Sequence, residues 1–149
     1  MPQRTPEYWW HAIGSSSFLE YAFLRWVLAP AVSNDINVCI TAQREIEVGD
    51  RRYSIDYEIR GAEQVLAIEL DGFEFHSSRK AFSYDRLRQN DLHATGCTVV
   101  RFSYDSIRSE TERCVSQLQS LLALDPKLRL STGSQNRKAR YERKSADGA

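Results

Sequence analysis

Two acidic residues and one glutamine lie in segments that otherwise have the apolar alternation of β-strands. Asp56 lies within YSIDYEI (53–59), Glu69 lies within VLAIELD (65–71), and Gln43 lies within residues 36–48. A carboxylate in an apolar run is costly unless a partner offsets its charge. A divalent cation is such a partner, and one or two carboxylates with water in the remaining positions describe a Mg²⁺ or Mn²⁺ site.

Two turns define a register that would bring these residues together. If Gly49-Asp50 is a two-residue hairpin loop, Gln43 lies opposite Asp56. If residues 61–64 form a four-residue loop, Asp56 lies opposite Glu69. One face of the sheet would then carry these three residues side by side, because a one-residue slip would put the carboxylates into the core. The other face would carry apolar side chains, namely Ile46, Tyr53, Ile55, Tyr57, Leu66, Ile68 and Leu70.

Further candidates for chemistry follow Glu69 along the chain. Asp71 is two residues on and therefore on the same face of the strand, and His76 follows in GFEFH. A histidine beside an acidic cluster can move a proton or hold a phosphate. The alternative is a solvated acidic face in which Glu69 pairs with an arginine and His76 is a surface or packing residue.

The elements that must position these residues can be read from the apolar pattern. Residues 15–29 form a helix in which Ser17 and Glu20 have the spacing of a capping box. Extended segments cover 36–48, 51–59, 65–71 and 97–102. Helices cover 78–95, followed by Gly96, and 105–124, with Asp105 as N-cap. The predicted order is α-β-β-β-α-β-α within an α/β domain.

The stretch from Gln43 to Ile107 resembles the very-short-patch-repair-like branch of the PD-(D/E)XK restriction-endonuclease-like superfamily. In that branch a strand ending in Asp precedes a strand with I-E-x-D-G and a following His, then a helix with D-x-x-R-x-x-x-L-x-x-x-G and a V-x-R-F strand. The resemblance covers about residues 15–108. The matching residues are Asp56, Glu69, Leu70, Asp71, Gly72, His76, Asp85, Arg88, Leu92, Gly96, Arg101 and Phe102.

This resemblance implies an αβββαβ core with a mixed central sheet flanked by helices, and Mg²⁺-dependent hydrolysis of phosphodiester bonds in DNA. Asp56 and Glu69 would bind the metal, helped by the carbonyl of Leu70. Glu20 would be a further acidic ligand, or else only the partner of Ser17 in the capping box. Gln43 would steady the attacking water or the phosphate. The implied protein is an endonuclease or nickase in bacterial defence, repair or mobile-element biology.

One position departs from the wider superfamily. The lysine two residues after the glutamate is absent, and Asp71 stands there, as is usual in this branch. The residue that polarises the water is therefore open, with His76, Lys80 and Arg88 as candidates. Lys80 could equally contact a phosphate or be merely solvated.

Charge is unevenly distributed along the 149 residues, although the formal net charge is zero. Residues 127–149 carry seven Lys or Arg and two acidic residues, a net charge of +5, and residues 131–149 have almost no apolar content. We expect a nuclease-like domain over 1–126 and a basic, disordered tail over 127–149. The tail would attract DNA phosphates, unless it only solubilises the chain. Its basic candidates are Arg137, Lys138, Arg140, Arg143 and Lys144.

Composition also limits location and partners. No apolar run is long enough to cross a membrane, and three widely spaced cysteines without a CxxC pair favour reduced thiols in a cytoplasm. The small size favours a separate specificity subunit, or a homodimer if both DNA strands are cut. A non-catalytic nucleic-acid-binding or assembly subunit on the same fold is the competing interpretation. A small-molecule enzyme has neither a Gly-rich phosphate loop nor a nucleophile motif to support it.

Overall fold

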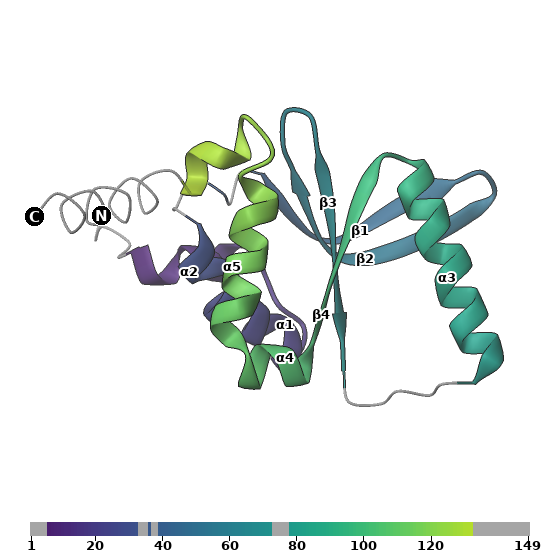
Figure 1. Cartoon of the computed structure of the whole chain (residues 1–149), viewed down its shortest axis with the longest axis horizontal. Helices are drawn as coiled ribbons and strands as arrows, with labels where there is room; N and C mark the ends of the chain where they lie inside the picture. Colours follow the sequence, from purple (N-terminus) through teal and green to yellow (C-terminus); the bar gives the residue numbers. More distant parts are fainter. Residues whose placement is uncertain (1–5, 33–35, 37–38, 73–77, 133–149) are drawn as a thin grey trace, which may run out of the picture.

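The computed structural model describes residues 6–32, 36, 39–72 and 78–132. The amino-terminal part is helical, followed by a sheet with one helix inserted before its last strand and by two further helices (Figure 1). The amino-terminal elements are η1 (Pro6–Ala12), α1 (Phe18–Ala22), η2 (Phe23–Leu28, a π-helical stretch) and α2 (Ala29–Ala31). The strands are β1 (Ile40–Val48), β2 (Arg51–Arg60), β3 (Val65–Asp71) and β4 (Cys97–Ser103). The later helices are α3 (Arg79–Ala94), α4 (Tyr104–Ser109) and α5 (Thr111–Leu122).

The sheet has four strands in the order β1-β2-β3-β4. The first three are antiparallel, and β4 runs parallel to β3 because α3 provides the crossover. Tyr57 lies opposite Ala42 in β1 and opposite Ile68 in β3, which is the predicted register on both sides. Gly49, with φ of 61°, forms the predicted two-residue turn. The mixed α/β fold with an αβββαβ core is therefore confirmed.

Helices cover both faces of this sheet. The amino-terminal helices, α4 and α5 lie together on one side, and α3 lies on the other (Figure 1). The larger apolar core joins the first group to the sheet and includes Phe23, Leu28, Leu66, Ile68 and Leu118. A smaller core under α3 contains Tyr53, Ile55, Ala67, Leu92 and Cys97.

The two cores correct the prediction of a single apolar face. Tyr57, Leu66 and Ile68 join the larger core as one set, but Tyr53 and Ile55 join the smaller core under α3. The pairing of β1 with β2 is interrupted at Gln43 and Asp56, and Gln43 has a left-handed φ of 51°. This break separates the two halves of the hairpin, so that each half packs on a different helical layer.

The helices also differ from their predicted bounds. The first is helical from Phe18 to Ala31, where 15–29 was predicted, and it ends at Val32, whose backbone is extended (φ −132°, ψ 163°). The predicted helix 105–124 is two helices, α4 and α5, separated at Glu110 (φ −129°, ψ 43°). The N-cap of α4 is Ser103, whose hydroxyl accepts the N–H of Ser106 at 3.1 Å, and not Asp105.

The chain continues past α5 into a junction organised by one carboxylate. Asp125 is fully buried and accepts five backbone N–H groups, from Ala62, Glu63, Gln64, Lys127 and Leu128, at 2.8–3.1 Å. It caps the helical turn 128–132 and ties that turn to the β2–β3 loop. Leu128 is buried in the larger core, so apolar packing extends past residue 126.

Within the described ranges, no helix combines the length and apolar character needed to cross a bilayer.

Candidate active site

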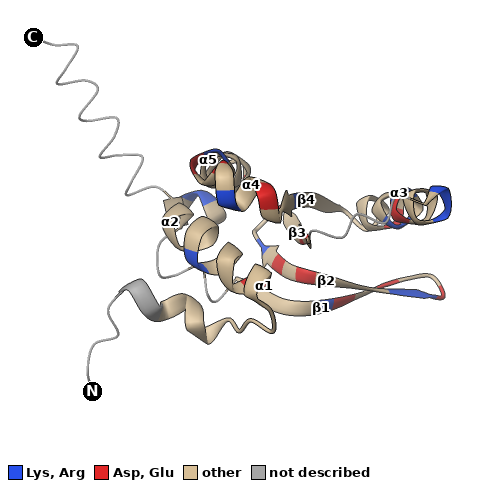
Figure 2. Cartoon of the chain, turned by 90° about the horizontal axis from the view of Figure 1, so that it is seen from below, with Lys and Arg blue, Asp and Glu red and all other residues tan. Residues whose placement is uncertain are grey.

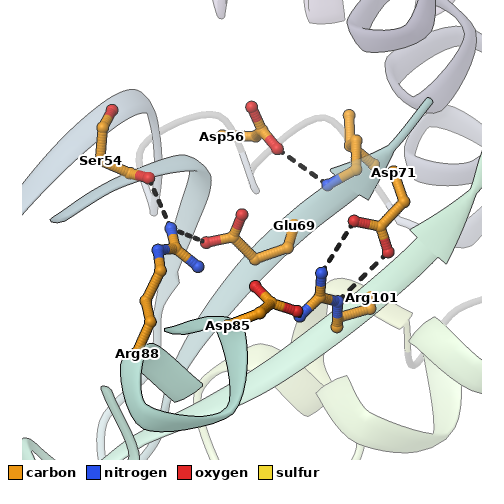
Figure 3. A network of polar contacts seen from close by, with 8 residues as sticks. Ser54, Asp56, Glu69, Asp71, Asp85, Arg88 and Arg101 are labelled. Atoms are coloured by element: carbon orange, nitrogen blue, oxygen red, sulfur yellow. Dashed lines mark hydrogen bonds and ion pairs between the residues drawn. The ribbon is translucent and has the colours of Figure 1, made fainter. Parts of the chain in front are cut away.

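The sheet forks at Asp56 and Glu69. Strands β2 and β3 pair from Arg60 opposite Val65 only as far as Tyr57 opposite Ile68. Beyond that point β2 stays with β1, whereas β3 continues beside β4 to Asp71. Asp56 is next to Tyr57 and Glu69 is next to Ile68, just beyond this last pair. Both carboxylates therefore lie where the two strands separate (Figure 3). In Figure 2 acidic residues appear along β2, between the amino-terminal helices and α3.

The side chain of Asp56 accepts a backbone hydrogen bond from β3 beyond the last residue pair of β2 and β3. Its Oδ2 accepts the backbone N–H of Leu70 at 2.8 Å. Burial raises the pKa of the Asp56 carboxyl above its ordinary range, and this hydrogen bond only partly offsets the burial. The nearby charges of Glu20 and Asp71 raise the pKa further, while Arg88 lowers it. The ionised form of Asp56 is therefore under-compensated by its protein surroundings.

Glu69 has a cationic partner. The guanidinium of Arg88, reaching down from α3, donates to Oε1 of Glu69 at 2.7 Å and to the carbonyl of Ser54 at 2.8 Å (Figure 3). Both side chains are largely buried, with 14% and 13% of their surface exposed for Arg88 and Glu69. Burial still raises the pKa of Glu69, because it outweighs the contribution of Arg88. The charge of Asp56 raises that pKa as well, which shows that the two carboxylates are electrostatically coupled.

Asp71 is neutralised by a different arginine. Arg101 of β4 donates to both of its carboxylate oxygens, at 2.9 and 3.2 Å, and also to Asp85 of α3 at 2.8 Å. These bonds join β3, β4 and α3 in one network and raise the pKa of Arg101, first through the bond to Asp71. Arg101 and Asp85 are among the motif residues, but the sequence predicted no role for either. An arginine on a buried strand and an aspartate on the preceding helix were the signal in the sequence for such an ion pair.

Glu20 lies on the other side of Asp56. Its Oε2 accepts bonds from the N–H and hydroxyl of Ser16 and from the hydroxyl of Ser17, and Gln43 donates its side-chain amide to Oε1. The Ser17 hydroxyl in turn accepts the N–H of Glu20 at 3.2 Å, as in the predicted capping box, but Glu20 accepts the backbone N–H of Ser16 and not that of the N-cap Ser17. Burial alone would raise the pKa of Glu20, but these hydrogen bonds together lower it. The strained Gln43 backbone therefore directs its side chain toward Glu20.

The structure thus brings together Glu20 from α1, Gln43 from β1, Asp56 from β2, and Glu69 and Asp71 from β3. Leu70 joins them through its backbone N–H. Arg88 belongs to the same site, whereas Lys80 is exposed at the start of α3. His76 and the basic positions Arg137, Lys138, Arg140, Arg143 and Lys144 lie outside the described residues.

Comparison with known proteins gives one family. The model of the restriction endonuclease-like family REase_MTES_1575 matches residues 37–122, more than half of the chain and all of the sheet. The chain belongs to this restriction endonuclease-like family. No curated protein sequence and no solved structure gives a significant match.

Members of restriction endonuclease-like folds typically use divalent metals, and the donors of this family member can be tested against that chemistry. Asp56 and Glu69 offer hard carboxylate oxygens, which Mg²⁺ and Mn²⁺ prefer. Each has one oxygen for which the described residues show no hydrogen bond, and burial disfavours each negative charge. Among the described residues, no three His, Cys, Asp or Glu side chains are arranged as a ready ligand set. The two carboxylates therefore fit a metal that completes its shell with backbone oxygen and water.

Proposed function

We propose that the protein is a metal-dependent DNA endonuclease or nickase of the very-short-patch-repair-like branch, acting in bacterial defence, repair or mobile-element biology. The observation that carries the proposal is the coupled pair Asp56 and Glu69 at the fork of the sheet. Both are partly buried carboxylates with raised pKa values, in a chain of a restriction endonuclease-like family. Such groups are typical of functional sites, because their charge is not offset by the fold itself.

Asp56 and Glu69 would hold Mg²⁺ or Mn²⁺ together with the Leu70 carbonyl. Glu20 would act indirectly, through its hydrogen bond with Gln43. When bound, the metal supplies a water of lowered pKa and positive charge to balance the phosphate. Since all the oxygens of Glu20 already accept hydrogen bonds, its contribution is to fix Gln43. Gln43 then orients the water or the phosphate with the remaining amide oxygen.

Arg88 is the cation that balances Glu69 in the metal-free chain. A metal at Glu69 competes with Arg88 for the same carboxylate, because two positive charges close together repel. Arg88 would then pair with a DNA phosphate, the other group its planar guanidinium matches. His76 remains the proposed proton carrier, and Asp71 contributes through Arg101.

Contacts with DNA extend beyond the carboxylate site in this proposal. Lys80 and the tail residues Arg137, Lys138, Arg140, Arg143 and Lys144 would neutralise phosphates, which makes binding salt-dependent. One active site cuts one strand, so a double-strand cut requires a second copy of the chain. A specificity subunit would supply sequence recognition, because a domain of this size has little surface left for it.

Incubation with supercoiled plasmid in Mg²⁺ or Mn²⁺ tests the activity. We expect nicked or linear products that EDTA suppresses. Asp56→Asn and Glu69→Gln should each reduce the cleavage rate at least about 100-fold, the scale on which one charge-stabilising group acts. Glu47→Gln is the matched control, because Glu47 is an exposed carboxylate on β1 whose side chain contacts only Arg52 among the described residues. Cleavage that survives Asp56→Asn would exclude this site as the source of activity.

A non-catalytic DNA-binding or assembly subunit is the second candidate, and the Arg88–Glu69 ion pair favours it. A carboxylate that already has an arginine partner has less need of a metal. In that case the plasmid stays intact in every metal, and DNA binding is unchanged by Asp56→Asn.

A further inference from the structure

An aromatic pocket of about 290 Å³ lies between α1 and α4. Buried Ala22 and Ile107 form its inner wall. Its outer wall includes two strongly exposed aromatic side chains, Phe18 at 60% and Trp26 at 41% exposed, together with Tyr104. Large aromatic side chains normally bury most of their surface, so two of them exposed around one hollow mark a binding surface.

The rings that form this pocket contact one another. The ring centroid of Phe18 is 6.1 Å from that of Trp26 and 6.2 Å from that of Tyr104. Arg108 also lines the pocket and makes no ion pair with any residue in the described ranges. The pocket therefore combines flat apolar surfaces with one cation that has no carboxylate partner there.

The pocket lies at the same end of the sheet as the carboxylate site. Phe18 is two residues before Glu20, which binds Gln43. Tyr104 follows Ser103, the end of β4, and Ser103 lies opposite Asp71 in the sheet. In Figure 1 both α1 and α4 lie near the end of the sheet at which β3 and β4 finish. The elements that carry the rings therefore begin next to residues of the carboxylate site.

We propose that the pocket binds one unpaired base of a DNA substrate, next to the phosphate held at the carboxylate site. The proposal rests on the proposed function, because it takes DNA to be the substrate of the fork. A base offers a flat aromatic face that stacks on aromatic side chains, and a lone arginine suits its phosphate. Only an unpaired base exposes that face, since a base within a duplex is already stacked on its neighbours. The pocket is at the small end for ligand sites, which suits one base and not a base pair.

Binding measured without cleavage tests this proposal. The Asp56→Asn protein in EDTA is titrated into two end-labelled duplexes, one with a single bulged 2-aminopurine and one with that base paired. We expect the bulged duplex to bind about tenfold more tightly, the scale of one stacked base. Stacking in the pocket should also quench the 2-aminopurine fluorescence.

Substitutions then locate the effect. Adding Trp26→Ala, or Phe18→Ala if the first variant melts at lower temperature, should abolish the preference for the bulged duplex. Phe82→Ala is the matched control, because Phe82 is an equally exposed aromatic residue (55%) on α3, outside the pocket. This control should keep the tenfold preference.

The outcomes separate this proposal from the nuclease activity. Cleavage by the wild-type protein without any preference for the bulge overturns the pocket proposal and leaves the nuclease in place. A preference that depends on Trp26, in a protein that never cleaves, supports the pocket and overturns the nuclease. Equal losses on both duplexes assign Trp26 to general DNA contact and overturn the base pocket. A concentration-dependent dimer that Trp26→Ala dissociates overturns it in favour of a second copy.

Discussion

Asp125 and Asp56 are both carboxylates that accept backbone N–H groups from the β2–β3 region, yet their surroundings differ sharply. Asp125 accepts five backbone N–H groups, three of them from the β2–β3 loop, and although burial alone would raise its pKa, these bonds lower it well below the ordinary range. Asp56 accepts one, from Leu70, and burial keeps its pKa above the ordinary range. Ionisation of Asp125 therefore stabilises the fold, whereas ionisation of Asp56 costs stability.

The difference shows how to separate a structural carboxylate from one available for chemistry. Backbone N–H groups already aimed at an oxygen leave no room for another ligand. A carboxylate with few donors instead gains from any cation that arrives, and Asp56 and Glu69 are in that position although Arg88 partly balances Glu69. The comparison predicts opposite responses to substitution, acid and metal at the two places.

The largest effect is expected at Asp125. In Asp125→Asn one oxygen becomes an NH₂ group facing backbone donors, since each carboxylate oxygen accepts at least two of them. Several buried N–H groups then lose their acceptor, and we expect a loss of about 4 kcal/mol in the free energy of unfolding at neutral pH. Urea denaturation of the full chain measures it. A loss below about 1 kcal/mol would mean that the hydrogen bonds of Asp125 contribute little to stability.

The pH dependence of this loss has a definite sign. Because the pKa of Asp125 is lower in the folded than in the unfolded state, its contribution is fully present above the ordinary aspartate pKa of about 4 and is lost as the pH falls below it. The wild-type and Asp125→Asn stabilities should therefore converge in acid. A gap that stays constant as the pH falls would contradict the assigned ionisation.

A smaller effect is expected for Gly61→Ala. A Cβ at Gly61 would overlap the carboxylate of Asp125, which five hydrogen bonds hold in place. We expect a loss of about 2 kcal/mol, as for an overpacked site, seen as a lower melting temperature. Gly72→Ala is the matched control, because a Cβ there meets no atom of the described residues within 4 Å. Equal melting temperatures for the two variants would show that the junction has room to relax.

The sequence predicted that Asp56 and Glu69 are neighbours, but neither the fork nor the junction, for physical reasons. Turn chemistry and the alternation of apolar residues restrict the register of a hairpin, so Asp56 and Glu69 could be placed side by side. Their arginine partner could be foreseen only as one possibility, because Arg88 reaches Glu69 from a helix whose packing is not encoded locally. Nothing in the sequence indicated that the apolar face is split at Gln43, because a glutamine with a left-handed backbone is rare in a strand.

Asp125 was overlooked because its bonds join residues about 60 positions apart. Its local signal was present: Asp before Pro126 is a common start of a helical turn, and Asp125 does cap residues 128–132. What no local pattern supplies is the β2–β3 loop placed on the other side of the same carboxylate.

The smallest effect, and the one that tests the comparison most directly, is expected for Asp56→Asn without metal. The raised pKa means that the charge of Asp56 costs stability as the pH rises through its folded value. An asparagine keeps an oxygen for the N–H of Leu70 and removes that charge. We expect a gain of about 0.5–1 kcal/mol at neutral pH, the scale of relieved repulsion between facing like charges, which shrinks toward zero in acid. Thermal melts in EDTA across this pH range measure it.

Mg²⁺ should reverse the order of the two proteins. A ligand that binds only the folded state raises its melting temperature, so added Mg²⁺ should stabilise the wild type and leave Asp56→Asn almost unchanged. Asp125→Asn, although weakened, should keep the full Mg²⁺ shift, because Asp125 has no part in the fork. Glu47→Gln should match the wild type throughout. If Asp56→Asn is destabilised and Mg²⁺ shifts neither protein, Asp56 is a second structural carboxylate like Asp125, and the chain binds DNA without cutting it.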